Sequence, residues 1–114
     1  MKLPGGERAY IDPRKLGSYA LNSVHVDGGA KARVFAAALG LRLQDAPVLE
    51  RALLDVARDN EAIAMGSNPD GDLYRIDFLL THRGRTARVR SGWIRPFDGT
   101  PTRLTTVFVL RAVT

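Results

Sequence analysis

Hydrophobic residues recur at helical spacing through the first half of the chain, and this pattern predicts three helices. They are predicted over residues 12–21, 30–41 and 45–60. Asp12 and Asp45 are suitable N-caps, and Pro13 fits the first helical position because an N–H has no helical partner there. Gly40 favours the left-handed conformation that ends a helix. The apolar stripe of the third helix comprises Leu49, Leu53, Val56 and Ala57.

The second half alternates between apolar and polar positions, which is typical of strands with one covered face. Strands are predicted over residues 73–81, 85–94 and 102–110, with a further short strand around 61–65. Helices followed by an antiparallel meander predict an α+β fold, with N-terminal helices packed on one face of a sheet of three to four strands. The length suits a single domain, residues 1–114, in which 1–60 are mainly helical and 72–114 form the sheet.

The alternation also assigns the strand residues to two faces of the sheet. The helices are expected to cover the face of Ile76, Phe78, Val89 and Val107. The uncovered face is then expected to carry Arg75, Asp77, Arg88, Arg90 and Thr106, with Leu104 and Phe108 beside Thr106. Side chains on neighbouring antiparallel strands lie within reach of one another, so this face could seat a phosphate backbone. The competing interpretation is an ordinary polar face that water covers.

Charge is divided unevenly along the chain. Residues 1–71 hold nine basic and nine acidic side chains, whereas residues 72–114 hold eight arginines and three aspartates, so the whole net charge of +5 lies in the second half. Arginine binds phosphate through two parallel hydrogen bonds. A basic half therefore favours a polyanionic partner, most often a nucleic acid. A solubilising surface in a chain with 14 arginines and 3 lysines is the alternative.

Composition argues against several other classes of function. The chain has no cysteine, which excludes disulfides and thiolate metal sites. Its two histidines and its acid-poor basic half do not form a recognisable metal site, so no metal or other cofactor is expected. No apolar run is long enough to span a membrane, and the first residues lack the apolar core of a signal peptide. A cytoplasmic protein with no membrane partner is expected.

Lys31 is the residue that helix packing explains least. The second helix has an apolar stripe of Val34, Phe35, Ala38 and Leu39. At 100° per residue, Lys31 falls near the centre of that stripe and Arg33 falls opposite it. The helix dipole disfavours a cation in the first turn. Lys31 is therefore expected to point toward the rim of the arginine-bearing sheet, although a lysine that extends past the core into water fits the same position.

His25 precedes a Gly28-Gly29 pair that leads into this helix. The N–H groups at a helix N-terminus favour an anion, and a histidine beside an anion can transfer protons near neutral pH. His82 lies in the predicted hairpin turn and is interpreted as uninvolved.

Three segments carry a resemblance to a known family: residues 3–41, 74–94 and 103–110. The most specific motifs are His25, KARVF (31–35), RTARVRSGW (85–93) and RLTT (103–106), with Ser91 where the family commonly has threonine. They resemble a small bacterial domain of unknown function that occurs alone and at the C-termini of large secreted toxin proteins. The order of helices and meander is similar to that of the barnase/EndoU/colicin/RelE-type ribonucleases. Those enzymes are metal-independent and build their sites from His, Lys or Arg, and Ser or Thr on the sheet.

The resemblance implies a metal-independent endoribonuclease domain of a bacterial toxin system that cleaves RNA through its 2′-hydroxyl. It implies His25 as general acid or base, Lys31 and Arg90 as stabilisers of the phosphorane, and Thr106 as a donor to a phosphate oxygen. The residues expected to hold RNA are Arg33, Arg75, Arg88, Ser91 and Trp93, the last by base stacking. RNA binding without cleavage and a non-catalytic interaction module, such as one partner of a toxin–antitoxin pair, are the alternatives. A cognate antitoxin or immunity protein is a further expected partner.

Overall fold

The structure, a computed structural model, describes residues 1–21 and 29–113 of the chain. Its helical elements are the 3₁₀ turns η1 (Gly6–Arg8) and η3 (Leu43–Asp45), the π-helix η2 (Lys15–Ala20), and the α-helices α1 (Gly29–Leu39) and α2 (Ala46–Asp59). Its strands are β1 (Ile63–Asn68), β2 (Gly71–His82), β3 (Arg85–Pro96) and β4 (Arg103–Ala112). The strands form one open antiparallel sheet in the order β1-β2-β3-β4. The predicted α+β fold, with helices followed by a meander, is confirmed.

The three predicted helices are present, with differences at their ends. Asp12 Oδ1 accepts a hydrogen bond from the backbone N–H of Arg14 at 3.0 Å, as an N-cap does, but the residues that follow form a π-helix. Gly40 has a φ of 65° and ends α1 as predicted. Asp45 does not cap α2 through its side chain. Its carboxylate instead accepts from the backbone N–H of Arg42 at 3.0 Å, so it stabilises the turn that leads into the helix.

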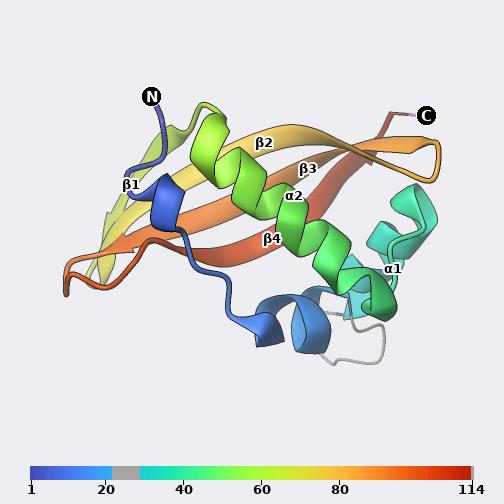
Figure 1. The fold of residues 1–114 in the computed structure, drawn as a ribbon, viewed down its shortest axis with the longest axis horizontal. Coiled ribbons are helices and arrows are strands. Elements are labelled where there is room, and N and C mark those ends of the chain that lie inside the picture. The colour runs from blue at the N-terminus through green and yellow to red at the C-terminus, as the bar shows by residue number, and fades with distance from the viewer. Residues whose placement is uncertain (22–28, 114) are drawn as a thin grey trace.

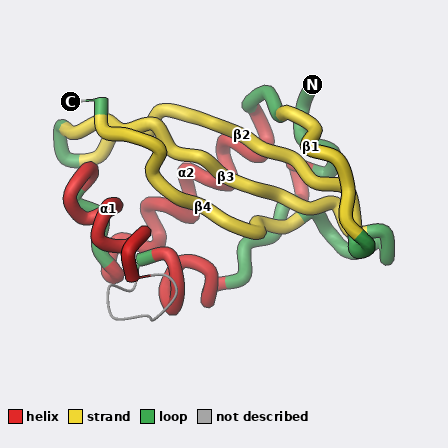
Figure 2. Tube along the Cα trace, turned by 180° about the vertical axis from the view of Figure 1, so that it is seen from behind, coloured by secondary structure: helices red, strands yellow, loops and turns green. Residues whose placement is uncertain are grey.

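The helices and the sheet form two layers. α2 crosses one face of the sheet, and α1 lies beside the edge strand β4 near the end of the β2–β3 hairpin (Figures 1 and 2). Buried side chains from both helices and three strands form the core between the layers, among them Phe35, Leu39, Leu49, Leu53, Ile76, Val89 and Leu104. The opposite face of the sheet carries no described helix, as the view from behind shows (Figure 2). No helix among the described residues is long and apolar enough to cross a membrane.

A β-bulge changes the expected alternation of β4. Leu104 pairs with Trp93 and Thr106 pairs with Gly92, so Thr105 is an extra residue on one strand. Leu104 consequently faces the helices and is buried in the core. The prediction that Leu104 lies with Thr106 on the uncovered face is therefore wrong, because strict alternation along β4 does not account for the bulge.

Candidate functional site

Lys31 extends from α1 to the uncovered face of the sheet. Its Nζ donates a hydrogen bond to Thr106 Oγ1 at 3.2 Å and lies 5.2 Å from the centre of the Phe108 ring. Thr106 and Phe108 pair with Gly92 and Arg90 of β3, which places them on that face. α1 packs beside the edge strand β4 (Figure 2). Because the Lys31 ammonium reaches Thr106 from this helix, the lysine side chain passes around the sheet edge. The structure thus brings together two residues that the sequence singled out.

The buried side of α1 differs from the predicted stripe. Phe35 and Leu39 are buried as expected, but Val34 is 46% exposed and Ala32, at 2%, lies in the core. The buried side is therefore rotated toward Ala32, and Lys31 lies at its border. A half-buried lysine at such a border packs its stem on apolar surface while its ammonium reaches a polar site.

The contact with Lys31 determines how the Thr106 hydroxyl can act. Because the ammonium donates to Oγ1, the oxygen is an acceptor there, and the hydroxyl proton is left to be donated to another group. An ammonium beside a hydroxyl donor is an arrangement that binds a phosphate oxygen.

Gly92 occupies the middle of a cross-strand row between Arg75 of β2 and Thr106 of β4. Strands lie roughly 4.8 Å apart, so about 10 Å of sheet separates the two outer residues. A Cβ at Gly92 would lie 2.9 Å from Thr106 Cγ2 and 3.0 Å from Thr105 Oγ1, because the bulge brings both threonines over the glycine. A larger residue at this position would displace the threonine that Lys31 contacts.

Asp77 lies at the centre of the uncovered face, among arginines. Arg90 donates from Nε and Nη2 to its two carboxylate oxygens at 2.8 and 2.9 Å, and Arg75 Nε lies 3.7 Å from Oδ2. The hydrogen bonds from Arg90 lower the pKa of Asp77, and the charges of Arg75 and Arg88 act in the same direction. The same bonds raise the pKa of Arg90. Asp77 therefore stays ionised and holds the Arg90 guanidinium in place.

Positive charge surrounds this carboxylate. Within residues 1–21 and 29–113, the uncovered face carries Arg75, Arg88, Arg90, Arg103 and Arg111, with Lys31 at its edge. Arg88 lies directly opposite Arg111 in the register of β3 and β4. Like charges in opposed positions destabilise a sheet, so an anion bound between these two residues would relieve their repulsion.

Ser91 and Trp93 are not on this face. Both are 0% exposed. Trp93 Nε1 donates to Ser91 Oγ at 2.9 Å, and Ser91 Oγ donates to the backbone carbonyl of Ile76 at 2.9 Å. The indole has no exposed surface on which a base could stack, so the predicted RNA-holding role of these two residues is incompatible with the structure. Ser91 and Trp93 lie two and four residues after Val89, so the strand alternation also places them on the covered side, where a large aromatic residue packs in the core.

The other residues that the sequence analysis weighed are Arg33, His25 and His82. Arg33 is exposed on α1, where it lines a groove together with Arg111. His25 belongs to residues 22–28, which lie outside the described residues. His82 ends β2, and its Nδ1 lies 2.7 Å from the backbone carbonyl of Leu39.

Phe108 and Arg111 are not among the site residues predicted from the sequence. The strand alternation did place Phe108 on the same face as Thr106, so its position beside the site could be predicted from the sequence. Arg111 lies beyond the end of the predicted strand at residue 110. A second bulge, at Leu110, moves Arg111 into the position opposite Arg88, and no local pattern indicates that shift.

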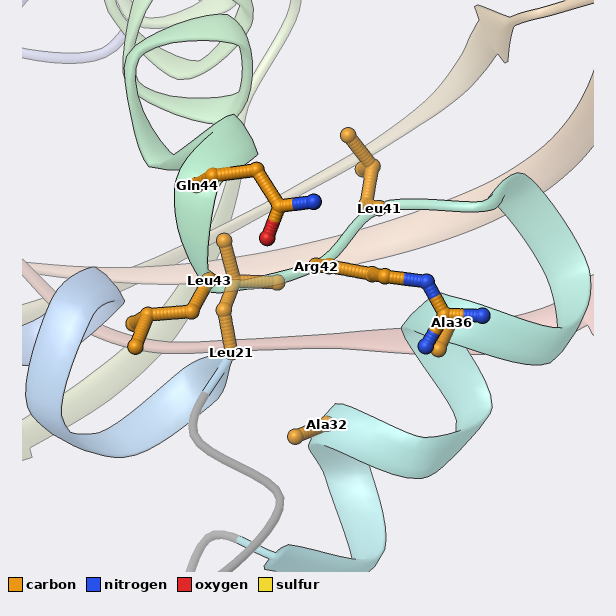
Figure 3. Close-up of a pocket in the computed structure, with 7 residues that line it drawn as sticks. All are labelled: Leu21, Ala32, Ala36, Leu41, Arg42, Leu43 and Gln44. Carbon is orange, nitrogen blue, oxygen red and sulfur yellow. The ribbon is translucent and has the colours of Figure 1, made fainter.

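A separate cavity of about 230 Å³ lies between η2, α1 and η3 (Figure 3). Its lining residues are Leu21, Ala32, Ala36, Leu41, Arg42, Leu43 and Gln44. Arg42 is the charged side chain among these lining residues and Gln44 is the uncharged polar one. The described lining therefore offers no pair of groups for acid–base chemistry, and the uncovered sheet face is the stronger candidate.

The fold and the site define an α+β domain with one helix-covered sheet face and one cationic face. A family model described as a domain of unknown function (DUF6883) matches residues 2–111. The chain belongs to this family. No curated protein and no solved structure matches the chain.

Proposed function

We propose that the uncovered sheet face binds RNA and that the domain cleaves it without a metal ion, as the ribonuclease of a bacterial toxin system. The observation that supports this proposal is the contact between Lys31 and Thr106 on a face that carries arginines from β2, β3 and β4. That face offers both an electrostatic surface for a phosphate backbone and one point where a cation and a hydroxyl meet.

The arginines would hold the RNA strand. Residues on the same side of a strand follow one another at roughly 7 Å, so Arg88 and Arg90 present charge along β3 while Arg111 and Arg75 extend it sideways. Each phosphate contact on single-stranded nucleic acid contributes about 0.7 to the slope of log affinity against log salt. RNA affinity should therefore fall steeply as salt rises.

Lys31 and Thr106 would act at the reacting phosphate. The 2′-hydroxyl oxygen attacks the adjacent phosphorus while its proton passes to a base, and the bond from phosphorus to the 5′-oxygen breaks as an acid protonates that oxygen. The products are a 2′,3′-cyclic phosphate and a 5′-hydroxyl. Lys31 would face the charge that develops on the non-bridging oxygens, and Thr106 would donate to one of them. His25 remains the proposed proton-transfer group.

Arg90 has a different role in this proposal from the one that the resemblance implied. Its Nε and Nη2 are directed at Asp77. It is therefore a positioning residue that fixes Asp77 and the arginines around it, while Lys31 is the cation at the phosphate.

The proposal includes no metal ion at the carboxylate in the centre of the face. Asp77 is held by Arg90 and Arg75, whose charges oppose a cation there. Cleavage should be unchanged by EDTA.

The decisive experiment compares cleavage and binding of a labelled single-stranded RNA by variants. Lys31→Ala should lower the cleavage rate on the order of a hundredfold or more, because it removes charge stabilisation in the transition state, while affinity falls less than about tenfold. Thr106→Val should act in the same direction. Arg51→Ala removes one charge from an exposed position on α2, and Arg33→Ala removes one from the same helix as Lys31. Both controls should leave the chemical step nearly unchanged.

The outcomes separate the alternatives. His25→Ala should flatten one limb of the pH–rate profile, and induced expression of the wild type, but not of His25→Ala, should arrest growth of a host. If the wild type binds RNA in a salt-dependent way but does not cleave it, the domain binds RNA without acting as a ribonuclease. Equal effects of Lys31→Ala and Arg33→Ala on cleavage, or no RNA binding at low salt, would contradict the proposal.

A further inference from the structure

A groove runs between α1 and the C-terminal half of β4. It has two adjoining parts of about 470 and 250 Å³, which share Ala30, Val34 and Val109 in their walls. Val109 pairs with a covered-face residue of β3, whereas Phe108, which also lines the groove, lies on the uncovered face. Because side chains from both sides of β4 line it, the groove follows the edge of the strand.

The groove is apolar because α1 has more apolar surface than the sheet covers. Val34 belongs to the predicted apolar stripe, yet it is 46% exposed and faces the groove. Alanines from α1 and the end of β4 complete the wall. Contiguous exposed apolar surface bordered by polar residues is characteristic of a protein interaction site.

The edge of β4 can accept another strand. Its inner edge pairs with β3. Along its outer edge, the described residues form one isolated bridge, between Tyr10 and Arg103 at the start of the strand. The later part of β4, beside the groove, presents the backbone N–H and C=O groups of an edge strand, to which an extended segment can hydrogen-bond.

Charge identifies the kind of partner. The charged side chains that line the groove among the described residues are Lys31, Arg33 and Arg111, all basic. A second copy of the chain, paired edge to edge, would bring these cations together, which is unfavourable. RNA is held chiefly by charge and aromatic stacking, whereas most of this lining is aliphatic. An extended protein segment with apolar and acidic side chains matches both the wall and the rim.

We propose that the groove binds a partner protein's extended segment, in which apolar and acidic residues alternate, added as a strand along β4. The apolar side chains lie against Val34 and Val109, and the carboxylates lie at Arg33, Arg111 and Lys31. A carboxylate at Lys31 competes with an RNA phosphate for the same ammonium. The docking itself is independent of the proposed function, and only this competition rests on it.

The test measures binding of a short fluorescent peptide in which valine and glutamate alternate, by anisotropy with the full chain and without RNA. The peptide should bind, and its affinity should fall as salt rises. Val34→Glu should lower the affinity at least about tenfold, because it places a charge in the apolar wall and repels the glutamates. Val48→Glu is the matched control, since Val48 is 41% exposed on α2. It should bind the peptide as the wild type does, and circular dichroism should show both variants folded.

Four results would overturn the inference. One is the absence of peptide binding by the wild type. A second is equal affinity of the Val34→Glu variant and the wild type for the peptide. A third is equal affinity of the wild type for this peptide and for a peptide with lysine in place of glutamate. The fourth is a concentration-dependent dimer in sedimentation that Val34→Glu abolishes, which would make a second copy the occupant. Peptide binding that is sensitive to Val34→Glu in a chain that neither binds nor cuts RNA would refute the proposed function and leave this inference standing.

Discussion

Replacing Ser91 by alanine tests the assignment of the Ser91–Trp93 pair to the core. Ser91 Oγ accepts from Trp93 Nε1 and donates to the carbonyl of Ile76, both at 2.9 Å, and neither Ser91 nor Trp93 is exposed. Ser91→Ala keeps the size of the side chain close to that of serine and removes only the hydroxyl. The indole N–H then has no partner in a place that water does not reach.

The expected cost follows from these two bonds. A buried donor left without an acceptor costs about 1–3 kcal/mol, and the lost bond to the carbonyl contributes about 1 kcal/mol. The free energy of unfolding should therefore fall by about 2–4 kcal/mol, which is a large share of the roughly 5–15 kcal/mol of an ordinary domain. With a urea m-value of about 2 kcal/mol per molar, the midpoint should fall by about 1–2 M.

The single tryptophan supplies the assay. Trp93 is the one tryptophan of the chain and is buried, so its fluorescence reports unfolding in urea without a label. Ser67→Ala is the control, because Ser67 is exposed on β1 and the same change there should shift the free energy by less than about 0.5 kcal/mol. RNA added to the wild type should leave the emission almost unchanged, since no base can reach the indole.

A double-mutant cycle sharpens the test. Trp93→Phe removes the indole N–H that donates to Ser91. In the Trp93→Phe background, Ser91→Ala should therefore lower the free energy of unfolding by about 1–3 kcal/mol less than it does in the wild type. A Ser91→Ala midpoint equal to that of Ser67→Ala would refute the buried network. Quenching of Trp93 by RNA at low salt would restore the stacking role that the structure excludes.

Other changes test the uncovered face and the packing beneath it. Asp77→Asn should make the salt dependence of RNA binding steeper, by about 0.7 for each additional phosphate contact that the released arginines form. The hydrogen bonds from Arg90 lower the pKa of Asp77 in the folded protein. The ionised Asp77 carboxylate therefore stabilises the fold at pH values above the ordinary carboxyl pKa of 3.8, and this stabilisation is lost as the pH falls through the lower pKa of the folded state. The difference in unfolding free energy between wild type and Asp77→Asn, measured in urea at several pH values, should therefore shrink below about pH 4, and a constant difference would contradict the pairing. Gly92→Val should displace Thr106 and slow RNA cleavage while the fold, followed by circular dichroism, is retained, because its Cβ would lie 2.9 Å from Thr106 Cγ2. Gly6→Ala should lower the melting temperature strongly, because its Cβ would overlap the backbone carbonyl of Ala57, whereas Gly17→Ala, with nothing within 4 Å, should have little effect.

Much of the fold could be predicted from local patterns in the sequence. A helix period of 3.6 residues and a strand period of two depend on neighbouring residues alone, so all three helices and the meander were predictable. The pairing of Asp77 with Arg90 follows similarly, because the short turn between β2 and β3 fixes the register of the two strands. The concentration of arginine in the second half is a property of the sequence, as is the alternation that assigns Arg75, Arg88 and Arg90 to one face.

Only the tertiary structure determined how α1 meets the sheet. Lys31 and Thr106 lie 75 residues apart in the sequence, and their contact depends on α1 lying beside β4 instead of squarely over the covered face. That placement rotates the buried side of the helix, which exposes Val34 and opens the groove. The bulges in β4 likewise move Leu104 into the core and Arg111 opposite Arg88. A hydrophobic stripe indicates that a helix must bury one side. The angle at which α1 lies to the sheet, and the strand against which it packs, depend on the packing energy of the whole core, where side chains distant in sequence must fill the same space.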